Sequence, residues 1–328
     1  GTLLACAEMI LGGTTTFCDM YLFEDQVARA AHEAGIRALV GEVLYDFPSP
    51  NYGSPEQGLA FTKDLIRAWE NDPLVSVAVE PHAVYTCSPD LLRACNEVAE
   101  EYQVPMIIHL SESEDEVAQV KERYSTSPVM HLEKLGLLTP HLIADHCVVL
   151  DDEEMDLLAE RGVRVVHNPE SNMKLASGVA PAVELLDRGV IMGLGTDGCA
   201  SNNNLDMFGE MDTAAKLHKV YRLDPTVMGA RTVAQLAVRG GSKVLGLENQ
   251  VGCLEPGKKA DIIGLDLDRP HLTPLYNIYS HLVYAASAAD VTLNIINGRV
   301  VMRNRELLTL DVERIMADVR AIAKRIKE

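Results

Sequence analysis

Strand-like and helix-like segments alternate along the chain from residue 14 to about residue 250. The strand-like segments are rich in β-branched and apolar residues and show little alternation of polar and apolar positions, as expected for strands that are buried on both faces. They are Thr14–Met20, Ile36–Leu44, Val75–Glu80, Val104–Leu110, His141–Val148, Val163–Val166 and Val190–Leu194. Repeated units of this kind predict a parallel sheet.

The helical segments carry boundary signals of their own. Ser88 is a good N-cap, and Pro89 suits the first position of a helix. The apolar residues that follow at helical spacing are Leu91, Leu92, Cys95, Val98 and Ala99. A second helix is predicted over 152–161, ending at Gly162 as a C-cap glycine.

The number of strands decides between two α/β folds. A closed TIM-type (β/α)8 barrel needs eight strands, whereas seven βα units are recognisable here. We therefore predict a barrel over residues 1–250 whose first strand would precede Gly1. An open, doubly wound parallel sheet is the structural alternative.

The pattern changes after residue 250. Segments 251–267 and 291–302 resemble short antiparallel strands, and Asn297-Gly298 is a strong two-residue hairpin signal. We predict a small β domain over 251–310 and a C-terminal helix over 311–328. The apolar residues that predict one docked face of this helix are Val312, Ile315, Val319, Ile322 and Ile326.

Composition limits the partners and the compartment. The formal net charge of −19 disfavours nucleic acid or an anionic membrane surface as a partner, and it favours a small neutral or cationic substrate. No apolar run approaches the roughly 18 residues that span a bilayer, and the N-terminus has no basic start. Seven cysteines without a C-x-x-C pair indicate a reducing compartment, so we expect a cytoplasmic protein.

Asp197 is the first candidate for chemistry. It follows the apolar strand 190–194 after a turn through Gly195. A carboxylate at the end of a buried strand is costly unless it is paired, hydrogen-bonded or bound to a metal. In an α/β barrel this position lies at the mouth of the active site.

Four of the ten histidines stand at or just after predicted strand ends, namely His82, His109, His146 and His167. For the other six we expect structural roles. His109 is either a metal ligand or a core histidine bonded to a backbone carbonyl. His146 could ligate a metal or orient a water molecule.

Glu112 follows His109 by three residues, at the top of the same strand. A carboxyl group shielded there from water can move protons. The alternative is a solvated loop glutamate, because residues 114–116 predict the acidic first turn of a helix. After His167, the polar residues Asn168, Ser171 and Asn172 are expected to hold loops through side-chain-to-backbone bonds.

Two motifs are set aside. Residues 193–198 match the dinucleotide pattern G-x-G-x-x-G, but Asp197 would put a negative charge in the phosphate cradle and no helix clearly opens at Gly198. Cys147 lies in an apolar run, where thiols are usually inert.

These motifs together resemble the amidohydrolase superfamily, in its deaminase and chlorohydrolase branch, and most of all the 5′-methylthioadenosine/S-adenosylhomocysteine deaminase family. The matching stretches, in order, are His109-Leu-Ser-Glu112, Asp145-His146-Cys-Val, His167-Asn-Pro-Glu-Ser-Asn-Met-Lys-Leu-Ala-Ser-Gly and Gly195-Thr-Asp197-Gly-Cys-Ala-Ser-Asn-Asn-Asn-Leu-Asp. The loop Pro81–Ser88 and the segment Val251–Asp261 are also similar to that family. The resemblance covers essentially the whole chain.

The resemblance implies a function and a role for each site residue. His109 and Asp197 would bind one divalent metal ion, zinc or alternatively Fe²⁺. Glu112 would carry a proton to the ring nitrogen, Asp197 would take the proton of the attacking water, and His146 would hydrogen-bond that water and steady the developing oxyanion. His82, with Glu112 and Asp197, would contact a nucleoside-like substrate. The implied reaction deaminates an adenosine derivative, and members of the family are commonly homo-oligomers.

Two departures from the family pattern qualify these expectations. The family's His-x-His pair, which supplies two further metal ligands, is absent from this chain, and a truncated N-terminus is the simplest account. Only two protein ligands would then remain, and metal affinity would be poor. The segment Gly41–Tyr52 is acidic and aromatic where S-adenosylhomocysteine would require basic residues. We therefore expect an uncharged 5′ group, as in methylthioadenosine, 5′-deoxyadenosine or adenosine.

Two alternatives remain open from the sequence. One is hydrolysis of another amino- or chloro-substituted ring, such as guanine or an s-triazine. The other belongs to a different class of protein, a catalytically inactive barrel or binding scaffold that holds no metal.

Overall fold

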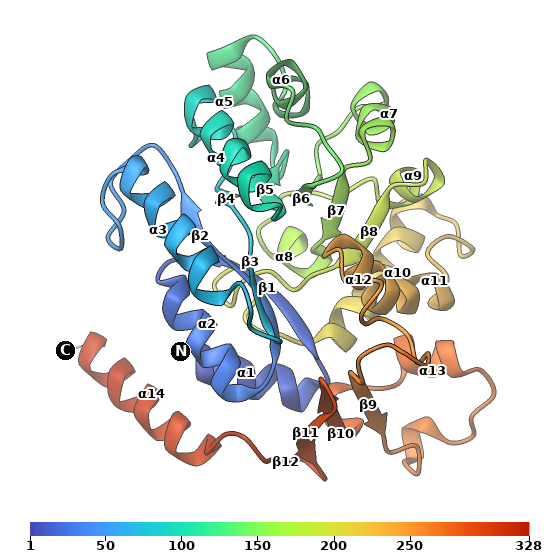
Figure 1. Cartoon of the computed structure of the whole chain (residues 1–328). Helices are drawn as coiled ribbons and strands as arrows, with labels where there is room; N and C mark the ends of the chain where they lie inside the picture. The colour runs from blue at the N-terminus through green and yellow to red at the C-terminus, as the bar shows by residue number, and fades with distance from the viewer. Residues whose placement is uncertain (328) are drawn as a thin grey trace.

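The computed structural model of the protein describes residues 1–327. Its parallel strands form one curved sheet with helices around the outside (Figure 1). The strands are β1 Thr16–Tyr21, β2 Arg37–Leu44, β3 Val75–Val77, β4 Glu80–Pro81, β5 Met106–Leu110, β6 Leu142–His146, β7 Arg164–His167 and β8 Ile191–Leu194. All seven predicted strands are confirmed, and one of them is divided into β3 and β4, which both pair with β2.

The strand order follows the chain. One group runs β1-β2-β3, with β4 also on β2, and a second runs β5-β6-β7-β8. Parallel bridges from Val79 to Met106 and from Ala83 to His109 join the two groups into one arc. No pairing connects β1 to β8 within residues 1–327. The result is the strand arrangement of a TIM-type barrel with β1 and β8 at its two edges.

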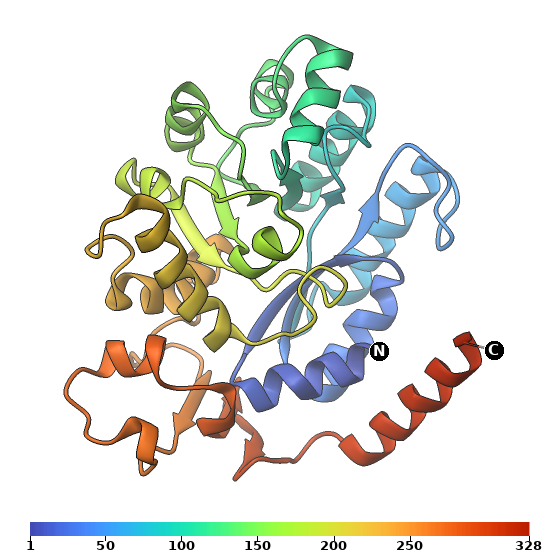
Figure 2. The same cartoon turned by 180° about the vertical axis from the view of Figure 1, so that it is seen from behind.

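The helices enclose the sheet from outside, which excludes the doubly wound alternative (Figures 1 and 2). They are α2 Glu24–Ala34, α3 Pro55–Trp69, α4 Pro89–Tyr102, α5 Glu114–Tyr124, α6 Pro128–Leu135, α7 Asp152–Arg161, α9 Ala182–Asp187, α10 Met207–Arg222, α11 Ala230–Gln235, the π-helical η1 Leu236–Gly240 and α12 Gly241–Val244. The short helix α8, Pro169–Lys174, lies instead in the middle of the ring in both views.

The predicted helix boundaries are confirmed by their caps. The Ser88 hydroxyl accepts the Leu91 backbone N–H, and Pro89 opens α4. Gly162 ends α7 with φ at 68°, the left-handed conformation that favours glycine.

Both faces of the strands are buried, as their unbroken apolar runs predict. All eight residues of β2 are buried. A small cluster of Leu39, Ala78, Ile107 and Ile143 packs with Val244 inside the sheet. The strand residues between them belong to the larger core beneath the helices. This rigid frame fixes the positions of the strand ends.

Residues after 250 form a separate antiparallel sheet in the order β12-β11-β10-β9. Its strands are β9 Ile262–Leu265, β10 Val291–Ile296, β11 Arg299–Arg303 and β12 Glu306–Leu307. The predicted hairpin is confirmed, because Asn297 and Gly298 have φ of 49° and 80° and connect the paired residues Ile296 and Arg299. The strand predicted over 251–267 is limited to β9.

This sheet packs on the N-terminal helix α1, Thr2–Gly12. The buried Asn294 amide donates to the carbonyl oxygens of Ile10 and Thr14, at 3.0 and 3.2 Å. The remaining elements between β9 and β10 are η2 Pro270–Leu272, α13 Ile278–Tyr284 and η3 Ala288–Asp290.

The C-terminal helix α14, Val312–Lys327, is present but does not dock along its length. Ile315 is buried at 5% exposure, whereas Ile322 and Ile326 are 43% and 80% exposed. Figures 1 and 2 both show the end of α14 projecting away from the body. The prediction of a fully docked stripe is therefore wrong beyond the first turns of the helix. None of the helices within residues 1–327 combines the length and apolarity needed to cross a membrane.

Candidate active site

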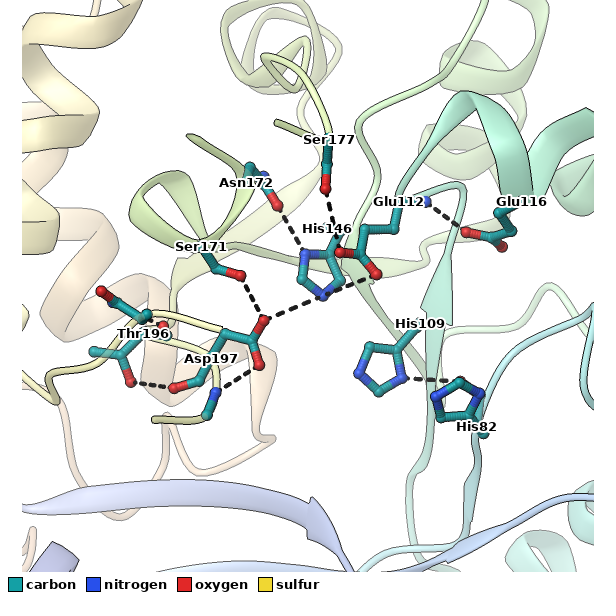
Figure 3. Close-up of polar contacts among 12 residues, drawn as sticks. His82, His109, Glu112, Glu116, His146, Ser171, Asn172, Ser177, Thr196 and Asp197 are labelled. Carbon is teal, nitrogen blue, oxygen red and sulfur yellow. Dashed lines mark hydrogen bonds and ion pairs between the residues drawn. The ribbon is translucent and has the colours of Figure 1, made fainter. Parts of the chain in front are cut away.

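The predicted site residues gather at the carboxyl ends of four parallel strands. His82 follows β4, His109 lies in β5 with Glu112 just beyond it, and His146 ends β6. Asp197 follows β8 by three residues. Since carboxyl ends of parallel strands share one rim, these side chains meet there (Figure 3).

Distances between the side chains define the centre of the site. His146 Nε2 lies 3.9 Å from Glu112 Oε2 and 4.0 Å from Asp197 Oδ2. The ring centroid of His109 lies 5.5 Å from that of His146 and 5.0 Å from that of His82. The structure thus brings together all five residues that the sequence singled out.

The backbone turns sharply where these residues leave their strands. Ser111, His146, Cys147 and Asp197 all have φ between 48° and 72°, a region that residues other than glycine rarely adopt. Such conformations persist only where the surrounding structure imposes them, and they cluster at functional sites.

Hydrogen bonds set the tautomer of His109. Its Nδ1–H donates to the His82 carbonyl oxygen at 2.9 Å. In the neutral ring, Nε2 then carries a lone pair that can bind a metal ion. The structure shows the predicted bond to a backbone carbonyl, and the role of His109 as a metal ligand stays a prediction.

His146 is oriented in the same way by a side chain. Its ring is buried at 1% exposure, and its Nδ1–H donates to Asn172 Oδ1 at 2.8 Å. Nε2 faces the carboxylates of Glu112 and Asp197. In the neutral ring this nitrogen is an acceptor, and the separations of about 4 Å leave room for a donor such as water, or for a cation.

Each carboxylate is also held by a serine. The Ser171 hydroxyl donates to Asp197 Oδ2 at 2.6 Å, and the Ser177 hydroxyl donates to Glu112 Oε1 at 3.3 Å. The Glu112 side chain is 26% exposed and that of Asp197 is 21% exposed, so both are partly shielded from water. Glu112 is not a loop residue in free solvent, because its carboxylate faces His146.

A neighbouring glutamate shapes the turn that carries Glu112. The carboxylate of Glu116 accepts the backbone N–H groups of Ser111 and Glu112 at 3.1 and 2.7 Å. Burial raises the pKa of Glu116 to about 7, and these backbone bonds oppose the rise. Glu116 belongs to the acidic first turn of α5, as predicted.

Comparison with known proteins identifies the family to which this arrangement belongs. The sequence profile of the amidohydrolase family matches residues 1–301. The chain belongs to the amidohydrolase family. Its strand-end histidines and its aspartate are the motifs on which the sequence resemblance was based.

Curated relatives of this amidohydrolase share one name. The chain is 63% identical over 327 residues to the 5-methylthioadenosine/S-adenosylhomocysteine deaminase of Syntrophobacter fumaroxidans, matching all of this chain and 75% of that protein. It is 57% identical over 328 residues to 5-methylthioadenosine/S-adenosylhomocysteine deaminase 1 of Syntrophus aciditrophicus, covering 100% of this chain and 74% of the relative.

Solved structures of two relatives contain zinc. An adenosine deaminase from Xanthomonas campestris with bound zinc superimposes with a TM-score of 0.97 at 41% identity, over 99% of this chain and 74% of that one. An atrazine chlorohydrolase from Arthrobacter aurescens complexed with zinc gives a TM-score of 0.91 at 27% identity, over 98% and 75% of the two chains. A divalent metal therefore suits this family.

The donors in this amidohydrolase fit a divalent metal in kind but not in number. His109 Nε2 and the Asp197 carboxylate are ligands that zinc prefers. Among residues 1–327, however, no three His, Cys, Asp or Glu side chains are arranged to hold a metal ion. His109 and Asp197 as the two protein ligands stay a prediction.

Ser171 and Asn172 were misjudged from the sequence. They were expected to bond backbone atoms within their own loop, but from α8 they bind the side chains of Asp197 and His146. The run Asn168-Pro169 signals a helix start, which places residues 171 and 172 in the first turn. Only the packing of α8 inside the ring reveals what they contact.

His167 lies outside the group that meets at the rim. It is fully buried, and its Nε2 lies 3.0 Å from Nε2 of His218 on α10. Burial lowers the pKa of His167 to about 3 and that of His218 to about 4. Both rings are therefore neutral at pH 7, and they form a structural pair.

The two motifs set aside are explained by packing. No helix starts at Gly198, since the next one is α10 at Met207. A Cβ on Gly193 would lie 3.1 Å from the Gly241 Cα, so this glycine permits close approach of α12. Cys147 is fully buried, and burial raises the pKa of its thiol well above the usual range.

Proposed function

We propose that this amidohydrolase removes the amino group of an adenosine derivative by hydrolysis, giving the inosine analogue and ammonia. The observation that carries the proposal is the meeting of Glu112, His146 and Asp197 around one acceptor-lined space, with His109 beside it. The deaminase relatives at 57–63% identity support the same reaction.

A divalent cation, zinc or Fe²⁺, would be held by His109 Nε2 and Asp197, and when bound it supplies activation of water at neutral pH. His146 Nε2, an acceptor, takes a hydrogen bond from the attacking water and orients it toward C6 of the purine. Asp197 receives the proton of this water and passes it to the leaving amine. Glu112 holds the proton that neutralises N1 as the water oxygen adds to C6.

The tautomer of His146 refines one expected role. A ring that donates through Nδ1 to Asn172 presents a lone pair at Nε2. In the neutral ring that nitrogen accepts from water, so orientation of the attacking water is the role that we assign to this form of His146. A ring protonated at Nε2 donates instead, which is the form that would steady the developing oxyanion.

His82 is suited to contact the substrate. The Thr86 hydroxyl donates to the Ala83 carbonyl oxygen, so Thr86 Oγ1 accepts the Nδ1–H of His82 at 2.9 Å. Burial, together with the neighbouring His109, lowers the pKa of His82 to about 4. The neutral ring then offers Nε2 as an acceptor for an amino or hydroxyl group of the nucleoside.

The segment 41–52 bears on the 5′ group of the substrate. It contains no lysine or arginine. The carboxylate of Glu42 accepts hydrogen bonds from the Glu24 backbone N–H and the Asn51 amide, at 3.0 and 2.8 Å. Both of its oxygens are therefore already bonded within the protein, one of them to the first residue of α2. Tyr45 and Phe47 stack with ring centroids 3.9 Å apart, and Phe47 is 51% exposed. These features favour an uncharged 5′ substituent over the charged one of S-adenosylhomocysteine.

Substrate preference is tested by ammonia release from a panel of methylthioadenosine, 5′-deoxyadenosine, adenosine, S-adenosylhomocysteine, guanine and an s-triazine. We expect kcat/KM for methylthioadenosine to exceed that for S-adenosylhomocysteine. The reverse order would refute the 5′ preference but not the deamination. Turnover of only guanine or the triazine would replace the proposed substrate class.

Metal analysis separates an enzyme from an inactive scaffold. We expect zinc or iron to bind the purified chain and a chelator to abolish both metal and turnover. Asp197→Ala and His109→Ala should each lower metal affinity, whereas His141→Ala, at an exposed strand start, should not. A chain that binds no metal even at millimolar zinc would support the scaffold instead.

All seven cysteines are free, which supports the expected reducing compartment. We extend the proposal to a protein of the cytoplasm. Fractionation of cells that produce it at natural levels would test this location.

A further inference from the structure

A buried carboxylate on α10 lies behind the site, outside the residues already assigned. Glu210 is fully buried, with 0% exposure. The Asn202 amide donates to its Oε1 at 2.7 Å, and the Glu170 backbone N–H donates to its Oε2 at 3.3 Å. No lysine, arginine or histidine pairs with it among residues 1–327. An unpaired buried carboxylate is costly, so its retention calls for an explanation.

The first contact leads from Glu210 to Asp197. The amide of Asn202 has two hydrogens, and it donates one to Glu210 and the other to the Thr196 carbonyl oxygen at 2.9 Å. Thr196 directly precedes Asp197, whose backbone is in the left-handed conformation. Asn202 is itself buried, at 7% exposure. Glu210 thereby fixes the loop that aims the Asp197 carboxylate.

The second contact leads to α8. The N–H that Glu210 accepts belongs to Glu170, in the first turn of this helix. The next two residues, Ser171 and Asn172, bond Asp197 and His146. The Glu170 carboxylate is also held on α10, by the Thr213 hydroxyl at 2.9 Å. These contacts between α8 and α10 fix the position of α8. The bonds from Ser171 to Asp197 and from Asn172 to His146 depend on that position.

We infer that Glu210 is a positioning residue, which holds Asp197 and His146 in place through the loop 196–202 and α8. It does not touch the substrate. The inference rests on the proposed deamination for its kinetic consequence, but its structural consequence is independent of turnover. Burial, together with the charges of Glu170 and Asp197, raises the pKa of Glu210 to about 8, and the hydrogen bonds from the Glu170 N–H and the Asn202 amide oppose the rise.

Glu210→Gln tests the inference by replacing one carboxyl oxygen with an NH₂ group. A glutamine offers one acceptor oxygen and one NH₂ group, so either Asn202 or Glu170 would face a donor instead of an acceptor. We expect kcat to fall about 10- to 100-fold, as for supports of other catalytic groups, with KM changed less than about threefold. Glu153→Gln, at an exposed position in the first turn of α7, is the matched control and should behave as wild type.

Hydrogen exchange of backbone amides distinguishes a positioning role from a general contribution to stability. Loss of a positioning residue raises exchange locally, whereas loss of a merely stabilising one raises it throughout the protein. In Glu210→Gln we expect faster exchange at the amides of Ser201, Asn202 and Asn203, at Asn172 in α8 and at its C-cap Leu175, all hydrogen-bonded in the wild type. Exchange in the distant helix α4 should be unchanged. A uniform rise in exchange, with normal kcat per folded molecule, would overturn the inference.

A second variant decides the matter if Glu210→Gln does not fold. Asn202→Ala removes the amide that joins Glu210 to Thr196 and also the oxygen that accepts from Asn204, but it leaves the bond from the Glu170 N–H to Glu210. It should therefore loosen the loop 196–203 and lower kcat while α8 stays protected. Wild-type exchange and kcat in this variant would refute the inference. If the wild type deaminates none of the purines, the proposed function fails, but the exchange pattern still tests the positioning role.

Discussion

At the scale of single residues, the direction of one hydrogen bond determines what each histidine can do. His109 and His146 both donate through Nδ1, the first to a backbone carbonyl and the second to Asn172. Each therefore presents Nε2 as a lone pair toward the rim of the barrel. The two rings differ in their surroundings, because His109 is half-buried beside His82 while His146 faces two carboxylates.

Asn172→Ala tests the support of His146. The buried Nδ1–H would lose its acceptor, so the ring could rotate or change tautomer. We expect kcat for deamination to fall about 10- to 100-fold. Asn172→Asp keeps an acceptor at this position and should retain more activity than the alanine variant. Equal kcat in both variants and the wild type would show that Asn172 does not orient the ring.

Glu112→Gln tests the proton carrier. The substitution keeps the size of the side chain but cannot transfer a proton, and the site is partly exposed, so folding should be preserved. We expect kcat to fall by about 10² to 10⁴, the range for loss of a general acid or base. Glu114→Gln, two residues along in the first turn of α5, is the control. Ammonia release measures both, and an active Glu112→Gln would assign the proton to another group.

At the scale of elements, α8 and α14 show that a helix is defined by what it packs against. Only six residues long, α8 lies inside the ring and supplies two contacts to the site. The longer α14 has an apolar stripe, yet only its first turns are buried. Amphipathic spacing predicts that a helix has an apolar face, but it does not supply the surface that covers this face.

The same substitution at two positions of α14 measures this difference. Ile315→Ala should reduce the free energy of unfolding by about 2–5 kcal/mol, because the side chain is 5% exposed. Ile326→Ala, where the side chain is 80% exposed, should change it by about 0.5 kcal/mol or less. Urea unfolding provides both values. Equal losses would mean that the end of α14 is covered in solution.

At the scale of the whole molecule, the acidic composition extends into the interior. Burial raises the pKa of Asp19 to about 6 and that of Glu24 to about 11, and the neighbouring charges of Asp19 and Glu42 also raise the latter. Glu80, fully buried, has its pKa raised well above the usual range by burial and by Glu24. Near the site, burial raises the pKa of Asp145 to about 7, with His109 opposing this and Asp197 and Glu112 adding to it.

These shifts predict how stability depends on pH. A carboxyl group whose pKa is raised in the folded state binds protons more tightly there than in the unfolded chain. Its contribution to the free energy of unfolding is therefore complete below about pH 4, where the group is protonated in both states, and this contribution declines as the pH rises. For Asp19 the decline runs from about pH 4 to about 6, and for Glu24 it continues to about 11. We expect a lower melting temperature at pH 8 than at pH 5.

Asp19→Asn should reduce this pH dependence, because a neutral amide replaces the titrating group. Asp90→Asn, at a side chain that is 98% exposed, serves as the control. Calorimetry at pH 5 and pH 8 gives the comparison. A melting temperature that rises toward pH 8 would contradict the interior carboxyls as the cause.

The sequence by itself determined the strands, the hairpin at Asn297-Gly298 and the choice of the rim residues. These follow from local rules: apolar runs define buried strands, and a polar residue at a strand end must lie at the edge of the sheet. The rule selects His82, His109, Glu112, His146 and Asp197, and it also selects His167, which the structure places in a buried pair with His218.

The tertiary structure alone decided which groups hold these residues and what remains exposed. The bonds from Asn172 to His146 and from Ser171 to Asp197 each join residues 26 positions apart, and the path through Asn202 to Glu210 exists only because α10 packs behind the rim. Such partners have no local signal, since they are set by the packing of whole elements. Residue spacing likewise predicted that α14 has an apolar face. Only the folded molecule showed that nothing within residues 1–327 covers Ile322 and Ile326 at the end of that face.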